Sequence, residues 1–105
     1  MSSDAIAVLV TAPDRESADV LARALVEERR IACANVLPGI RSVYRWEGRV
    51  EEGEEVLLVL KTTRARFEEV RARVVELHPY EVPEVIALPV VAGHEAYLRW
   101  IADSV

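Results

Sequence analysis

The sequence contains a single cysteine, a single lysine and no glutamine, and it has few aromatic residues. One cysteine, Cys33, excludes an internal disulfide. No apolar run reaches the roughly 18 residues that a membrane span needs, and no charged and then apolar leader opens the chain. We therefore expect a cytoplasmic protein that neither crosses a membrane nor is secreted.

The charge balance is acidic, with 18 Asp and Glu against 13 Lys and Arg and a net charge of -5. This balance disfavours partners bound through phosphate groups, namely nucleic acids and membrane surfaces. A length of 105 residues predicts one domain, residues 1–105. Abundant Glu and Arg with few thermolabile side chains favour a thermostable protein.

The stretch from Ile40 to Thr63 predicts one long β-hairpin. Polar and apolar residues alternate along its first arm, as in a half-buried strand. Glu47 and Gly48 supply the turn, because glycine readily takes the positive φ that a tight hairpin requires. The second arm, of about 13 residues, is much longer than a usual strand. We expect part of this hairpin to pair with another copy of the chain, since a long unpaired edge promotes aggregation.

The remaining pattern predicts an α+β, ferredoxin-like fold of order βαββαβ with a C-terminal helix. A nearly continuous apolar run at 5–11 predicts a central strand buried on both faces. The strand at 31–37 could form one bent element with the hairpin's first arm. The expected helices cover 14–29, with Pro13 and Asp14 at its start, 64–77, with Thr63 as its cap, and 94–103. A further strand is expected at 85–91, and Pro89 favours an edge or a bulge at its far end.

Two residues are candidate metal ligands. The imidazole of His78 suits Cu, Zn and Ni, although a histidine in a last helical turn can instead bond the helix carbonyls. Cys33 offers a soft thiolate, although a lone cysteine in an apolar strand is more often a small buried hydrophobe. The acidic run from Glu51 to Glu55 is interpreted as a solvated strand face rather than a metal-collecting patch.

A second group of residues mixes aromatic walls with one cation and one carboxylate, which is the composition of a small-molecule pocket. Lys61 stands out as the only lysine, and Glu84 could pair with it or bind a ligand. The alternative role is packing at a subunit interface, with a Lys–Glu pair that fixes the register. The group comprises Tyr44, Trp46, Lys61, Tyr80 and Glu84.

Several short motifs resemble the CutA divalent-cation tolerance proteins in identity, order and spacing. They are Cys33-Ala34-Asn35, Ser42-Val43-Tyr44-Arg45-Trp46-Glu47-Gly48, Leu60-Lys61-Thr62, His78-Pro79-Tyr80, Pro83-Glu84 and Tyr97-Leu98-Arg99-Trp100. The resemblance implies a non-enzymatic, PII-like homotrimer of ferredoxin-like subunits that contributes to tolerance of copper and other divalent metals. It implies Cu(II) first and Zn(II) second as bound metals, neither of them needed for folding, and it leaves the protein partner unknown.

The sequence departs from this family at two positions. Some bacterial members proposed to bind copper have a cysteine late in the first strand and a second histidine before the HPY motif. Here these positions are Thr11 and Leu77. A metal site within one subunit is therefore disfavoured, whereas residues from three subunits could converge at an interface.

Other functions of βαββαβ domains fit less well. An acylphosphatase-like enzyme needs a phosphate-binding loop after the first strand, and residues 11–14 contain no glycine and do contain an acid. An RNA-recognition domain needs stacking aromatics on its central strands, which lack them. Two alternatives remain, a PII-like signalling trimer that binds a small metabolite between subunits and a purely structural trimeric scaffold.

Overall fold

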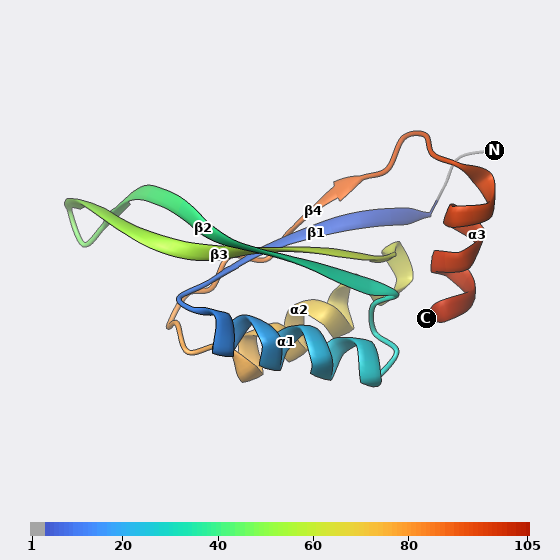
Figure 1. Ribbon diagram of the computed structural model, residues 1–105, viewed down its shortest axis with the longest axis horizontal. Coiled ribbons are helices and arrows are strands. Elements are labelled where there is room, and N and C mark those ends of the chain that lie inside the picture. The colour runs from blue at the N-terminus through green and yellow to red at the C-terminus, as the bar shows by residue number, and fades with distance from the viewer. Residues whose placement is uncertain (1–3) are drawn as a thin grey trace.

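A computed structural model describes residues 4–105 and has two main layers (Figure 1). The four strands form one antiparallel sheet in the order β2-β3-β1-β4, and α1 and α2 cover one face of it. This arrangement confirms the predicted ferredoxin-like order with its C-terminal helix. The elements are β1 (Ala5–Ala12), α1 (Arg15–Glu27), β2 (Cys33–Trp46), β3 (Arg49–Thr63), the 3-10 turn η1 (Arg64–Arg66), α2 (Phe67–Leu77), β4 (Ile86–Pro89) and α3 (Glu95–Ser104).

The core lies between the sheet and the two covering helices. Alternate residues of β1, such as Val8 and Val10, are fully buried against Leu21 and Leu25 of α1 and the apolar face of α2. The residues between them, such as Leu9, are only half-buried. The prediction of a strand buried on both faces is therefore wrong for most of β1 in the single chain, because α3 contacts the second face only near Ala5 and Cys33 and no other described helix covers it.

The two long helices begin in different ways. Asp14 is the N-cap of α1, and its carboxylate accepts a hydrogen bond of 2.8 Å from the Ser17 amide, which lowers the pKa of Asp14. Pro13 precedes this cap and lies outside the first turn in which it was expected. The predicted Thr63 cap is also wrong, since its side chain makes no capping bond and the chain instead passes through η1 before α2.

The predicted hairpin forms β2 and β3, which pair from Trp46 opposite Arg49 to Cys33 opposite Lys61. Glu47 and Gly48 both have positive φ, 50° and 78°, as a tight two-residue turn requires. β2 is one strand with an irregularity between Leu37 and Ile40, so the expected bent element is confirmed.

The outer part of the hairpin projects from the body of the molecule (Figure 1). β1 ends at Ala12, opposite Val56, so residues 40–55 pair only within the hairpin. The molecule is correspondingly long, 45 × 25 × 23 Å, and its radius of gyration of 14.2 Å exceeds the roughly 13 Å expected for a compact chain of this length.

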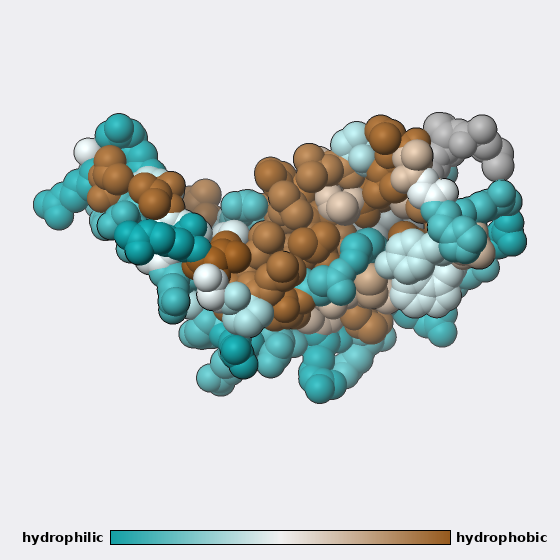
Figure 2. Space-filling view, turned by 45° about the horizontal axis from the view of Figure 1, so that its top comes forward, coloured by the Kyte–Doolittle hydropathy of each residue, from teal (hydrophilic) through white to brown (hydrophobic). Residues whose placement is uncertain are grey.

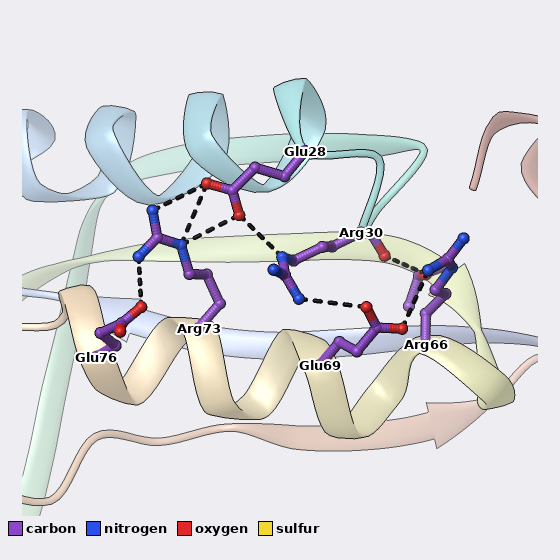
Figure 3. A network of polar contacts seen from close by, with 7 residues as sticks. Glu28, Arg30, Arg66, Glu69, Arg73 and Glu76 are labelled. Carbon is purple, nitrogen blue, oxygen red and sulfur yellow. Dashed lines mark hydrogen bonds and ion pairs between the residues drawn. The ribbon is translucent and has the colours of Figure 1, made fainter.

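Charged side chains join the end of α1 to α2 (Figure 3). The Glu28 carboxylate accepts bonds from Arg73 at 2.9 Å and Arg30 at 2.8 Å, and Arg30 also lies 3.3 Å from Glu69. Hydrogen bonds from Arg73 and then Arg30 lower the pKa of Glu28. A carboxyl whose pKa is lowered on folding stabilises the fold above its unfolded-state pKa, and this contribution disappears as the pH falls.

Beside this network, the fully buried Thr62 hydroxyl donates a 2.6 Å hydrogen bond to the Arg30 carbonyl oxygen. Thr62→Val should lower the free energy of unfolding by about 1–3 kcal/mol, because it leaves a partly buried carbonyl without its donor. Thr63→Val is the control, since the Thr63 hydroxyl makes no capping bond. Urea unfolding of both variants measures the difference, and equal stability of the two would contradict this role of Thr62.

Glu28→Gln should lower the melting temperature at pH 7, and its difference from wild type should shrink as the pH falls below the ordinary range of a glutamate, because the wild-type carboxyl then becomes protonated. Glu27→Gln makes the same change of charge on an exposed residue of α1 and should leave the melting temperature nearly unchanged. Thermal melts at pH 7 and at successively lower pH measure the effect. A difference between Glu28→Gln and wild type that does not depend on pH would exclude the ionic contribution.

Candidate functional site

His78 caps the C-terminal end of α2 and is almost fully buried. Its Nδ1 accepts the Tyr80 amide at 3.0 Å, so Nε2 carries the ring proton and donates to the Thr11 carbonyl oxygen at 2.7 Å. The ring therefore joins the end of β1 to the loop after α2, and it does not bond the carbonyls of its own helix. A metal ion could reach His78 only by displacing one of these two bonds.

Cys33 begins β2 and is half-buried, so the expectation of a buried cysteine holds only in part for the single chain. Its Sγ lies 3.6 Å from the Tyr97 hydroxyl of α3. Tyr97 in turn stacks on Trp100 with ring centroids 5.5 Å apart. This contact with the thiol is the main reason that the pKa of Tyr97 is raised.

The structure does not bring His78 and Cys33 together. The His78 ring bonds Thr11, which lies opposite Leu57 of β3, whereas Cys33 lies opposite Lys61. Four residues of strand separate these positions, or about 13 Å. Residues 4–105 contain no group of three or more His, Cys, Asp and Glu side chains that could hold a metal ion. The two predicted ligands of one chain thus do not fit a metal site by themselves.

A cavity of about 730 Å³ opens where the hairpin leaves the sheet. Four of the five predicted pocket residues line it, namely Tyr44, Trp46, Tyr80 and Glu84. The other lining residues are Thr11, Arg41, Ser42, Val43, Glu55, Pro79, Glu81 and Val82.

Lys61, the fifth predicted pocket residue, does not line this cavity. It lies opposite Ala7 and Cys33 in the sheet, and its Nζ donates a hydrogen bond to Asn35 Oδ1. The suggested Lys61–Glu84 pair is absent from the described residues, where Lys61 pairs with Asn35 instead. The strand register places this lysine on the sheet, away from the loop that carries Glu84.

The chemistry of the cavity is dominated by acids and aromatic rings. The Tyr80 hydroxyl donates a 2.6 Å bond to Glu55 Oε2, and burial together with this carboxylate raises the pKa of Tyr80. Burial and the nearby Glu55 also raise the pKa of Glu84. The interpretation of the acidic run as a solvated face holds for Glu52 and Glu54 but not for Glu51 and Glu55, which are half-buried, and Glu55 lines the cavity. Only its position next to the buried Val56 could have indicated this role.

The sheet face opposite α1 and α2 is an apolar surface that α3 covers only at the Cys33 end, and its uncovered part is here called the open face (Figure 2). Residues that lie directly opposite each other in an antiparallel sheet share a face, so Leu9, Val59 and Ile86 lie together on it. Ile86 and Leu88 of the edge strand β4 are 51% and 49% exposed. An apolar surface of this kind indicates an interaction site.

No helix among residues 4–105 is both long and apolar enough to pass through a lipid bilayer.

Comparison with known proteins gives a consistent result. The sequence pattern of the CutA1 divalent ion tolerance proteins matches residues 6–104. The divalent-cation tolerance protein CutA of Thermus thermophilus is 50% identical over 97 residues, which cover 92% of this chain and 94% of that protein. The chloroplastic CutA protein of Arabidopsis thaliana is 46% identical over 94% of this chain and 54% of its own length.

Solved structures agree with this assignment. The structure of the divalent cation tolerance protein (Cut A1) from Thermus thermophilus superposes with a TM-score of 0.93 at 48% identity, over 95% of this chain and 97% of that one. The CutA1 structure from Oryza sativa gives a TM-score of 0.94 at 42% identity, over 98% and 94% of the two chains. This chain belongs to the CutA1 divalent ion tolerance protein family.

Proposed function

We propose that this chain contributes to divalent-cation tolerance as a non-catalytic, cytoplasmic homotrimer that binds copper weakly through residues contributed by different subunits. Membership of the CutA1 family supports the general role. The observation that carries the proposal is the open face, because a sheet with one uncovered apolar side needs a partner surface. The projecting hairpin supports the same assembly, since residues 40–55 offer strand edges that no second strand of the described chain covers.

In the homotrimer, another copy of the chain covers the open face with an apolar surface of its own. Exposed apolar side chains on β4 would be removed from water there, at roughly 25 cal/mol for each Å² buried. A closed ring of three subunits also leaves no free edge for further addition, which distinguishes it from open aggregation.

Copper binding through shared residues fits Cys33 better than His78. Cys33 keeps partial exposure at the start of β2, whereas His78 is almost fully buried and both of its ring nitrogens are engaged. Thiolate and imidazole ligands both suit copper, and one copy of a residue from each subunit could complete a ligand set that a single chain lacks.

The cavity beside the hairpin supports a second candidate function, a PII-like trimer that binds a small metabolite. Its volume of about 730 Å³ and its mixture of aromatic and charged lining residues are typical of small-molecule sites. Because the cavity contains hairpin residues, a neighbouring subunit that packs on the hairpin would complete its outer wall.

Ile86→Glu should convert the trimer to monomers in sedimentation velocity, because it places a charge on the open face. Val20→Glu is the matched control, since Val20 is also 51% exposed but lies on α1, on the other side of the sheet. It should remain trimeric. A wild-type protein that sediments as a monomer, or an Ile86→Glu variant that stays trimeric, would overturn the assembly.

Calorimetric titration of Cu(II), with Zn(II) as a redox-inert probe, should show weak binding that falls about tenfold or more in Cys33→Ser, because the thiolate ligand is lost. His78→Gln should instead lower the melting temperature, since it disrupts the two bonds of the imidazole, and should change metal affinity less. Affinities that are unchanged in both variants would exclude these residues as ligands.

A further inference from the structure

We propose that the cavity at the base of the hairpin binds a small organic cation, an amine or a guanidinium compound. The charged end would lie beside the Glu55 and Glu84 carboxylates, and the carbon body would lie against the aromatic walls. This inference rests on the second candidate function, the binding of a small metabolite, and it names the class of that metabolite.

The first argument is the charge of the lining residues. Three of them are acids, Glu55, Glu81 and Glu84, and one is a base, Arg41. The Arg41 guanidinium is already paired at 2.9 Å with Glu52, which does not line the cavity. The cavity therefore keeps an excess of negative charge, which attracts cations and repels phosphates and carboxylates.

The second argument is that Glu84 has no partner among residues 4–105. It makes no ion pair or hydrogen bond there, whereas Glu55 accepts the Tyr80 hydroxyl. Partial burial, and after it the neighbouring Glu55 carboxylate, disfavour the charged form of Glu84 and raise its pKa. A ligand ammonium or guanidinium group between the two carboxylates would relieve this repulsion and donate hydrogen bonds to both.

The third argument is the aromatic content of the walls. The faces of Tyr44, Trp46 and Tyr80 can stabilise a cation within about 6 Å of a ring centre. Tyr80 is held in place by its bond to Glu55 and by the His78 ring, whose centroid is 4.7 Å away. Pro79, in the same wall, restricts the backbone of this loop. This part of the site is therefore preorganised, which reduces the entropic cost of binding.

These features favour an organic cation over a metal ion. A divalent metal needs several oxygen, nitrogen or sulfur ligands at about 2.0–2.6 Å, and no group of three or more suitable side chains converges within residues 4–105. Aromatic walls supply no such ligands, whereas they do contact the carbon body of an amine. The cavity is also much larger than one hydrated ion requires.

Three probes with the same carbon frame test the charge class: 2-phenylethylamine, 2-phenylethanol and phenylacetate, at pH 7. Calorimetry of the full-length protein should give an affinity for the amine that is about fivefold or more above that for the alcohol, with phenylacetate weakest. In Trp100→Phe, Trp46 is the only tryptophan. The fluorescence of Trp46 should change on titration with the amine, and the midpoint of this change should match the midpoint of the calorimetric titration.

Glu84→Gln should weaken binding of the amine about fivefold and leave binding of the alcohol unchanged. Glu27→Gln removes the same charge from an exposed site on α1 that does not line the cavity, and should have little effect on either probe. An equal effect of both substitutions would show that only the net charge matters and would overturn the assignment of Glu84.

The remaining outcomes separate this inference from the function on which it rests. Binding of the alcohol or of phenylacetate as tightly as the amine would overturn the cation class but keep a small-molecule site. Absence of binding by all three probes, with unchanged Trp46 fluorescence, would overturn both. Neither result would affect the trimer or its metal binding, which the sedimentation and copper titrations test separately.

Discussion

Strand β1 carries apolar side chains on both of its faces, whereas α1 and α2 cover only one of them. Val8 and Val10 are buried in the core, and Leu9 faces the other way onto the open face. Successive side chains of a strand point to opposite faces, so helices packed on one face of β1 cannot bury the side chains of both faces. The alternation thus accounts for the stable interior of the chain and also for its need of a partner surface.

The loop after α2 depends on the same sheet. Its His78 ring is bonded to the backbone near the end of β1, and its Tyr80 hydroxyl is bonded to Glu55 of β3. These two bonds hold the loop across the end of β1. Beyond this point only β2 and β3 remain paired. The loop held in this way forms one wall of the cavity, so His78, a candidate metal ligand by its chemistry, helps to shape the cavity.

Much of this fold could be predicted from the sequence, because its signals are local. Glu47 and Gly48 mark the turn, and the spacing of Leu21 and Leu25 marks the first helix. The chemistry of the cavity could be predicted in part. Its aromatic wall, which includes Trp46, and its carboxylate, Glu84, both belong to short motifs that resemble the CutA family. The position of Lys61 relative to the cavity could not be predicted, because it depends on where the loop after α2, which carries Glu84, crosses the sheet, and local patterns do not specify such a tertiary contact.

The sheet also joins parts of the chain that are far apart in sequence. The hairpin pairs neighbouring segments across a two-residue turn, whereas β4 pairs with β1, so that Val8 lies opposite Ala87. Pairing β4 with β1 closes the long stretch of chain between them. The entropic cost of this closure rises only logarithmically with length, but only the four residues of β4 make sheet contacts that offset it. β4 is therefore the least firmly held strand of the isolated chain, and a neighbour that packs on Ile86 and Leu88 would complete its folding as well as cover it.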